Sequence, residues 1–237
     1  MTDADALASA VDGTVERLGG IDVAMANAGV AIGGAAAELE LEPMERLVQI
    51  NLIGSMRTLK LCLPHVLERR GYLLAVASVA AVGHVPGLAA YSASKAGIEA
   101  FADALRIEVA HRGVEVGVAY YSWIDTDMVR SADDRRDFAA MRGDLKGPFG
   151  KTHPVGKAAD ATIRGIERRA RWVTFPRWID ALILTRGIAP LIAERQVRDA
   201  MPEVERLTSE EAARLGSAAS QPVGPGGAAA SRSASPR

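Results

Sequence analysis

The sequence contains very little cysteine and histidine, and these shortages narrow the kinds of site that it can hold. Among 237 residues there is one cysteine, Cys62, so no internal disulfide can form. The four histidines are scattered, and with one cysteine they give no metal-ligand spacing. We therefore predict a protein without a metal site, in a reducing and hence cytoplasmic environment.

An excess of one charge and long apolar runs are also missing. The formal net charge is −1, which gives no reason to expect nucleic acid or an anionic membrane as a partner. The N-terminus has no basic segment followed by an apolar one, and no apolar run approaches the ~18 residues that a membrane span needs. The best stretch, residues 178–193, is interrupted by Asp180, Arg186, Gly187 and Pro190. We expect neither a secretory signal nor a transmembrane segment.

Short apolar runs alternate with helical patterns over residues 1–176. The pattern predicts strands at 21–26, 72–77, 114–120 and 171–175, and helices at 4–18, 43–70, 90–112 and 158–170. The nearly continuous first run predicts a strand buried on both faces. This alternation predicts right-handed βαβ units, and hence an α/β domain with a doubly wound, Rossmann-like parallel sheet.

The remaining segments differ in composition. Residues 126–152 are polar and contain glycine, which predicts a mobile segment over a site. Residues 177–215 form a helical extension. It either covers the substrate cleft or packs in an oligomer, or it lies on a membrane surface through Trp172, Phe175 and Trp178. Its interrupting charges favour the first alternative. Residues 216–237, rich in Ala, Gly, Ser and Pro, predict a disordered tail.

Tyr91 and Lys95 are the main candidates for chemistry. They are four residues apart in a predicted helix, so their side chains share a face. A positive charge ~4 Å from a phenolate favours it by roughly 4 kcal/mol at an effective dielectric of about 20. This attraction lowers the pKa of the tyrosine before the cost of desolvation is subtracted. Ser78, at the end of a predicted strand, could hydrogen-bond the same substrate oxygen, so these residues predict a general acid/base.

Three features converge on one edge of the predicted sheet. Asn27, Ser78 and the segment after Tyr120 all follow strands, and ligands bind at the carboxyl ends of parallel strands. Asn51 and Gly54 are poor helix formers in the middle of a long predicted helix, which calls for a specific reason.

These residues resemble the classical short-chain dehydrogenase/reductase family over roughly residues 2–176. Taken singly, each piece is more simply an ordinary turn, cap or exposed helix residue. All of them in order, at the family's spacing, are a strong signal. The matching pieces are Asn27-Ala28-Gly29, Asn51, Ser78, Tyr91-Ser-Ala-Ser-Lys95 and Asp125-Thr126-Asp127-Met128.

The resemblance implies a role for each catalytic candidate. Tyr91 would be the acid/base, Lys95 would lower its pKa and bind the nicotinamide ribose, and Ser78 would orient the substrate oxygen. Asn51 would bend its helix and hold a water beside Lys95. The implied reaction transfers a hydride between NAD or NADP and an alcohol or ketone.

The resemblance also implies cofactor contacts and partners. Asn27, Ala28 and Gly29 would steady the cofactor pocket, and Thr126 with the backbone of Ile124 would meet the nicotinamide carboxamide. The apolar residues Met128, Phe138 and Met141 favour a lipophilic small-molecule substrate. Ala-rich helix faces around Leu63 and Leu105 favour a homodimer or homotetramer.

Two departures from the family pattern affect these expectations. Tyr121-Ser122 stand where the family usually has Pro-Gly, which leaves the local backbone and the substrate range open. No Gly-rich turn before a helix, which would hold the cofactor pyrophosphate, precedes Asn27. We therefore expect an N-terminally truncated sheet lacking about 60 residues, with its first strand at an open edge. A late start codon at Met1 would explain it, and reading the upstream DNA in frame tests this.

A non-catalytic protein is the rival interpretation. It would be a catalytically impaired truncated homologue, or a nucleotide-binding or interaction module that kept the fold. The complete Asn–Ser–Tyr–Lys set favours an enzyme, whereas the missing half favours the rival. We expect weak or no NAD(P)H binding by these 237 residues, followed by cofactor fluorescence. Tight binding with turnover would contradict the truncation.

Overall fold

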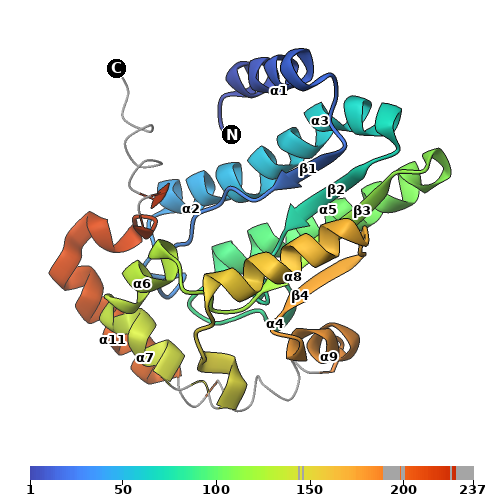
Figure 1. Ribbon diagram of the computed structural model, residues 1–237. Helices are drawn as coiled ribbons and strands as arrows, with labels where there is room; N and C mark the ends of the chain where they lie inside the picture. Colours follow the sequence, from blue (N-terminus) through green and yellow to red (C-terminus); the bar gives the residue numbers. More distant parts are fainter. Residues whose placement is uncertain (144, 146, 189–197, 199–200, 225, 228–237) are drawn as a thin grey trace.

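A parallel four-stranded sheet forms the centre of the molecule (Figure 1). The computed structural model describes residues 1–143, 145, 147–188, 198, 201–224 and 226–227. The strands follow one another in space as they do in sequence, and every neighbouring pair is parallel. They are β1 (Val23–Ala26), β2 (Tyr72–Val76), β3 (Glu115–Tyr121) and β4 (Trp172–Phe175).

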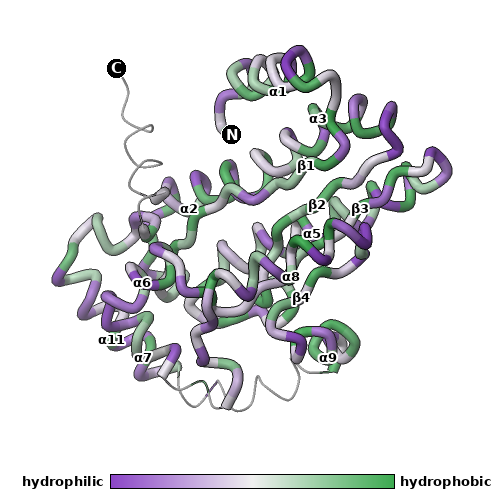
Figure 2. The backbone as a smooth tube through the Cα atoms, viewed as in Figure 1, coloured by the Kyte–Doolittle hydropathy of each residue, from purple (hydrophilic) through white to green (hydrophobic). Residues whose placement is uncertain are grey.

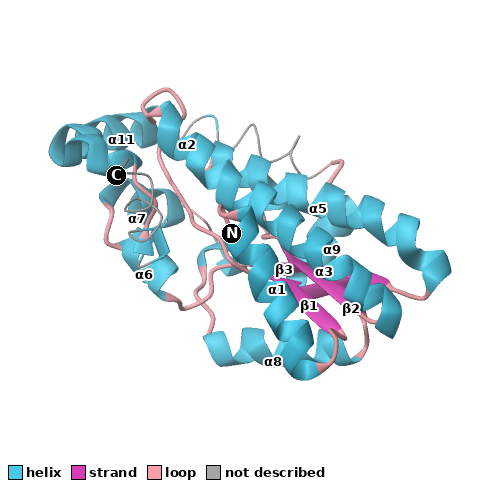
Figure 3. Ribbon diagram, turned by 90° about the horizontal axis from the view of Figure 1, so that it is seen from above, coloured by secondary structure: helices cyan, strands magenta, loops and turns pink. Residues whose placement is uncertain are grey.

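Helices connect the strands and cover both faces of the sheet (Figure 3). The α/β, Rossmann-like prediction is thus confirmed, and most boundaries differ from the predicted ones by one to three residues. The connecting helices are α2 (Leu41–Val48), α3 (Ser55–Arg69), α4 (Ala80–Gly83), α5 (Ala89–Val109) and α8 (Val155–Glu167). Before the sheet, α1 (Ala4–Leu18) begins at Asp3, whose carboxylate accepts a hydrogen bond from the Ala6 amide, and ends at Gly19 with φ 77°.

Alternation of side chains along the strands builds two cores. In β2 all five residues are buried. Leu73 and Ala75 face the core shared with α3 and α5, whereas Leu74 and Val76 face the core covered by α8. The apolar character of these strands is visible along the backbone in Figure 2. A strand that is covered on both sides has no need of polar residues, which explains the continuous apolar runs in the sequence.

β1 departs from the expectation of a strand buried on both faces. It pairs with β2, and within the described residues no strand pairs with its other edge. Val23 is 42% exposed, whereas Ala24 and Ala26 pack into the core under α3. β1 therefore has an unpaired edge within the described residues, and one of its faces is partly exposed.

The long helix predicted over residues 43–70 is divided. A π-helical segment, Gln49–Gly54, separates α2 from α3 and contains the poor helix formers Asn51 and Gly54. Extra residues in such a segment re-aim the side chains within it, and π-segments occur frequently at functional sites. Pro64 lies inside α3, which continues through it.

The polar segment 126–152 is largely helical. It contains α6 (Asp127–Asp133), α7 (Arg136–Gly143) and a short 3₁₀ turn at Gly147–Gly150. α9 (Trp178–Thr185) belongs to the main core, because Ile179 and Ile183 are buried there. No helix of the described residues is both long and apolar enough to cross a membrane.

The predicted disordered tail is wrong over its first residues. After α11 (Met201–Leu215), a 3₁₀ turn spans Gly216–Ser220, and Ala219, Ser220 and Val223 are buried. The Val223 amide donates to the Ala31 carbonyl at 2.9 Å. Tertiary contacts therefore order this segment, although its composition alone predicts disorder. Residue 225 and residues 228–237 lie outside the described part of the chain.

The expected subunit contact around Leu105 also needs correction. Leu105 is 6% exposed and packs in the core between α5 and the sheet, together with the half-buried Leu63. Ile107, which is 71% exposed, is the large apolar residue that α5 presents to solvent.

Candidate active site

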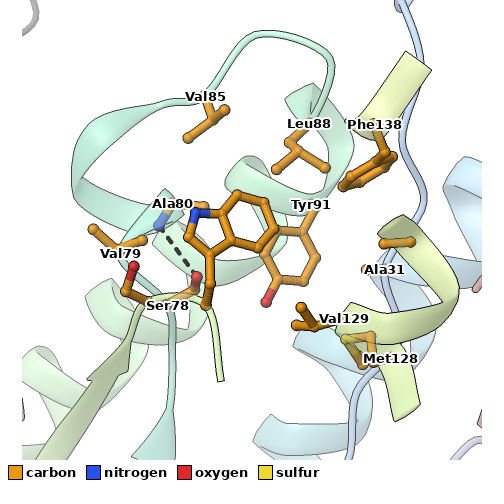
Figure 4. A pocket seen from close by; sticks show the side chains of 13 residues that line it. Ala31, Ser78, Val79, Ala80, Val85, Leu88, Tyr91, Met128, Val129 and Phe138 are labelled. Carbon is orange, nitrogen blue, oxygen red and sulfur yellow. Dashed lines mark hydrogen bonds between the residues drawn. The ribbon is translucent and has the colours of Figure 1, made fainter. Parts of the chain in front are cut away.

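The end of β2 and the first turns of α5 bring three of the predicted residues together, and two of them, Ser78 and Tyr91, are seen in Figure 4. Ser78 lies two residues after the end of β2, and Tyr91 and Lys95 lie one turn apart on α5. The ammonium nitrogen of Lys95 is 5.7 Å from the centre of the Tyr91 ring. In Figure 4 the Tyr91 hydroxyl and Ser78 border the same cavity.

Among the described residues, one hydrogen bond to the backbone holds the buried Lys95 ammonium. Its side chain is 4% exposed, and Nζ donates to the carbonyl oxygen of Val76 at 2.9 Å. Burial lowers the pKa of Lys95 to about 8 because the charged form loses hydration. The described residues engage one of the three N–H donors of this ammonium, so the group can also bind oxygen atoms of a ligand.

The pKa of Tyr91 moves against the sequence-based expectation. Burial raises it, and a hydrogen bond with Ser78 opposes this by stabilising the phenolate. The cost of desolvation outweighs this hydrogen bond, and the Lys95 ammonium donates to the Val76 carbonyl and not to the phenol. Ser78 Oγ also accepts from the Ala80 amide at 3.2 Å, which fixes the hydroxyl at the start of α4.

Asn51 links the π-helical segment to the loop after β1. Its Oδ1 accepts from the Val30 amide at 2.8 Å and its Nδ2 donates to the Val30 carbonyl at 2.9 Å. Nδ2 is also 3.2 Å from Oγ of Ser94, which in turn donates to the Tyr91 carbonyl at 2.7 Å. The π-segment therefore directs the fully buried side-chain amide of Asn51 towards the loop after β1 and towards α5, the helix that carries Tyr91 and Lys95. Ser94 was not singled out from the sequence, although it lies between Tyr91 and Lys95 in the matched motif.

Gly29 is the member of Asn27-Ala28-Gly29 that reaches the site. A Cβ on Gly29 would lie 3.1 Å from Asn51 Oδ1 and 3.5 Å from Lys95 Nζ, so the missing side chain leaves room beside the ammonium. Asn27 and Ala28 are exposed. They remain cofactor-contact predictions.

The loop after β3 places Ile124 and Thr126 at the same end of the sheet. Ile124 is buried and forms a β-bridge with His153. Thr126 is the N-cap of α6, with its Oγ1 3.5 Å from the Val129 amide and 3.3 Å from the Ile124 carbonyl. The described contacts give Thr126 a capping role, and its contact with a cofactor remains a prediction.

A cavity of about 80 Å³ lies in front of Tyr91. Ser78, Tyr91 and Ser122 contribute hydroxyl groups, and no charged side chain of the described residues lines it. Met128 and Phe138 line it as expected, whereas the side chain of Met141 lies outside the described part of the chain. The apolar lining consists of Ala31, Val79, Ala80, Val85, Leu88, Trp123, Met128, Val129, Ala132 and Phe138.

The residues present fit the nicotinamide-ribose end of a dinucleotide. Lys95 offers donors for ribose hydroxyls, and Gly29 leaves space beside it. The sequence offers no Gly-rich turn before the β1 strand for the pyrophosphate. Within the described residues, no cluster of three or more His, Cys, Asp or Glu side chains could hold a metal ion.

Comparison with known proteins identifies the family. The model of the short chain dehydrogenase family matches residues 1–137, more than half of the chain. The chain therefore belongs to the short chain dehydrogenase family, a family of oxidoreductases that use NAD or NADP.

Individual relatives are distant and longer. An uncharacterized oxidoreductase of Myxococcus xanthus is 35% identical over 129 residues, which are 54% of this chain and 51% of that protein. An 11-beta-hydroxysteroid dehydrogenase-like protein of Arabidopsis thaliana is 27% identical over 185 residues, 78% of this chain and 57% of that protein. The chain thus spans about half the length of these curated relatives.

A solved structure shares the fold. The crystal structure of a short chain dehydrogenase from Mycobacterium paratuberculosis bound to NAD matches with a TM-score of 0.62 and 24% identity. The match covers 73% of this chain and 69% of that chain.

Proposed function

We propose that this protein is an NAD(P)-dependent oxidoreductase that interconverts an alcohol and a ketone, with Tyr91 as the acid/base. The observation that carries the proposal is that Ser78 and Tyr91 line one apolar cavity, while the Lys95 ammonium lies 5.7 Å from the centre of the Tyr91 ring. Family membership supports the class of reaction.

In ketone reduction, the Tyr91 hydroxyl donates its proton to the substrate oxygen while the Ser78 hydroxyl hydrogen-bonds the same oxygen. A nicotinamide cofactor bound here would supply the hydride for the carbonyl carbon. Lys95 stabilises the phenolate that forms, and it would hold the ribose hydroxyls of the cofactor in the space that Gly29 leaves. Asn51 and Ser94 position Val30 and the Tyr91 backbone.

The lining of the cavity favours a neutral, lipophilic substrate. A carboxylate would be buried there without a described counter-ion, at a cost of several kcal/mol. One relative carries hydroxysteroid dehydrogenase in its name, which agrees with such a substrate. As the family suggests, we also propose a homodimer or homotetramer, which sedimentation velocity tests.

The decisive test replaces Tyr91 by Phe in an upstream-extended chain and measures turnover of a panel of neutral ketones with NADH and NADPH. We expect kcat to fall by about 10²- to 10⁴-fold, since the phenylalanine cannot transfer a proton. Unreduced activity would remove Tyr91 from its role. Binding of cofactor without turnover of any ketone or alcohol would instead favour the non-catalytic, nucleotide-binding alternative.

Tyr72→Phe is the matched control. Tyr72 lies on the other face of the sheet, where its hydroxyl donates to the Ala170 carbonyl at 2.7 Å. We expect this variant to lose about 1 kcal/mol of stability and to keep its activity.

A further inference from the structure

Residues 216–224 form an ordered strap after α11, and this strap lies against the wall of the substrate cavity. The Val223 amide donates to the Ala31 carbonyl at 2.9 Å, and Ser220 Oγ accepts from the Glu40 amide at 3.1 Å. At the far end, Gly224 adopts φ +80°, and a Cβ there would lie 3.1 Å from the Met128 Cα. The strap is thus fixed to the loop after β1, to the start of α2 and to α6.

Arg135, between α6 and α7, ties the strap to this wall. Its guanidinium donates to the carbonyl oxygens of Ala219 and Gly33, the latter at 3.1 Å. It also forms an ion pair with Asp137 at 2.7 Å, in which the two side chains are 9% and 3% exposed. These buried hydrogen bonds favour one position of the strap, because a displacement of the strap would leave the Arg135 guanidinium without the Ala219 carbonyl as a partner.

Phe138 connects the strap to the cavity, because it lines the cavity and packs in one cluster with Val223 of the strap. The Asp137 carboxylate accepts from the Phe138 amide at 2.9 Å, and Val223 packs with Phe138, Leu88 and Ala31 in one cluster. The Phe138 ring lies directly on Gly33, where an added Cβ would be 1.6 Å from its Cε2. Gly33 lies against one side of the ring and Val223 of the strap packs in the same cluster, so a shift of the ring towards the strap disturbs close packing.

We propose that the strap closes the substrate cavity and limits the size of the ketone that it admits, with Arg135 as the positioning residue. This proposal rests on the proposed oxidoreductase function. The cavity of about 80 Å³ accepts a compact substrate, whereas a bulkier one has to displace Phe138 and therefore the strap. Close packing makes that displacement costly, so loosening the strap favours the bulky substrate.

The test compares kcat/KM for cyclohexanone and for the bulkier 2-decalone, with NADH or NADPH as reductant. We define the substrate ratio as kcat/KM for 2-decalone divided by kcat/KM for cyclohexanone. In Val223→Ala and Arg135→Lys, we expect this ratio to be on the order of 10-fold higher than in wild type. Cyclohexanone turnover stays within about twofold, since neither residue lines the cavity. Val155→Ala and Arg136→Lys are the matched controls, as both side chains are exposed, and they should leave the ratio unchanged.

Amide hydrogen exchange supplies a readout that does not depend on turnover. We expect the Val223 amide to exchange at least about tenfold faster in Arg135→Lys than in Arg136→Lys, because the strap opens more often. An unchanged exchange rate, or faster exchange with an unchanged substrate ratio, overturns the proposal. If Arg135→Lys does not fold, Val223→Ala decides through the substrate ratio.

Failure of the proposed function is distinguishable from failure of the strap. If wild type turns over no ketone at all, the oxidoreductase proposal falls. Binding of the two ketones, measured by calorimetry, then decides the strap. Tighter binding of 2-decalone to Val223→Ala than to wild type supports it, and equal affinity overturns it.

Discussion

Lys95 Nζ lies 5.7 Å from the centre of the Tyr91 ring, yet its hydrogen bond goes to a backbone carbonyl at the end of β2. The charge is thus held close to the phenol by the sheet itself. Because the sheet fixes the ammonium, the pair is preorganised for the moment when the phenol becomes a phenolate. The cost is a lysine charge buried in the interior.

That cost predicts a pH-dependent stability difference between wild type and Lys95→Met. The pKa of Lys95 falls from 10.5 in the unfolded chain to about 8 in the folded one, so between these values the unfolded state binds more protons. The penalty of burying the charge is fully present below pH ~8 and is relieved as the pH rises towards 10.5. We expect wild type to gain about 3 kcal/mol relative to the variant over this window, measured by urea unfolding. The exposed Lys157→Met is the control, and an equal gain relative to that variant would contradict the prediction.

Asn51→Ala should be strongly destabilising. The substitution leaves the Val30 amide and carbonyl without their described partners, in a buried place where water does not replace them. We expect a loss of about 3 kcal/mol in the free energy of unfolding. Gln49→Ala, in the exposed part of the same π-segment, should change it by less than about 0.5 kcal/mol. Similar losses in the two variants would remove the special role of Asn51.

Gly29→Ala should weaken cofactor binding more than it affects stability. The added methyl lies 3.5 Å from Lys95 Nζ and 3.1 Å from Asn51 Oδ1, in the space that we assign to the ribose. We expect the Kd for NAD(P)H to rise about 10-fold, equivalent to about 1.4 kcal/mol, followed by cofactor fluorescence.

Gly13→Ala is the control for this experiment. Nothing lies within 4 Å of a Cβ at Gly13 in α1, so this substitution should leave the Kd unchanged. It should also stabilise the protein by roughly 0.5–1 kcal/mol, because alanine loses less backbone freedom in a helix. An unchanged Kd for Gly29→Ala would place the ribose elsewhere.

Arg186→Ala should loosen the contact between the end of α9 and α5. Arg186 forms an ion pair with Glu99 of α5, whose side chain is 4% exposed, and removing it leaves a buried carboxylate without this counter-ion. We expect a loss of about 2 kcal/mol, below the full cost of a buried pair because Arg186 is 45% exposed. Arg177→Ala, with a 91% exposed arginine, should cost less than about 0.5 kcal/mol. Equal effects in thermal unfolding would contradict this anchoring role.

Local patterns in the sequence were enough to predict the layered fold and the order of its elements. Strand and helix signals are local. The apolar run Leu73–Val76 predicts a buried strand from its own composition, and the spacing of Tyr91 and Lys95 places them on one face of a helix. The family motifs added the roles that those positions imply.

The contacts between distant segments could be seen only in the folded chain. Asn51 reaches Val30 across 21 residues, and Arg135 reaches Ala219 across 84, and neither pairing leaves a periodic signal in the sequence. For the same reason the composition of residues 216–224 predicted disorder, although buried hydrogen bonds from α2, from the loop after β1 and from Arg135 hold them in place. The direction of the shift in the Tyr91 pKa likewise depends on burial, which the spacing of residues along a helix does not reveal.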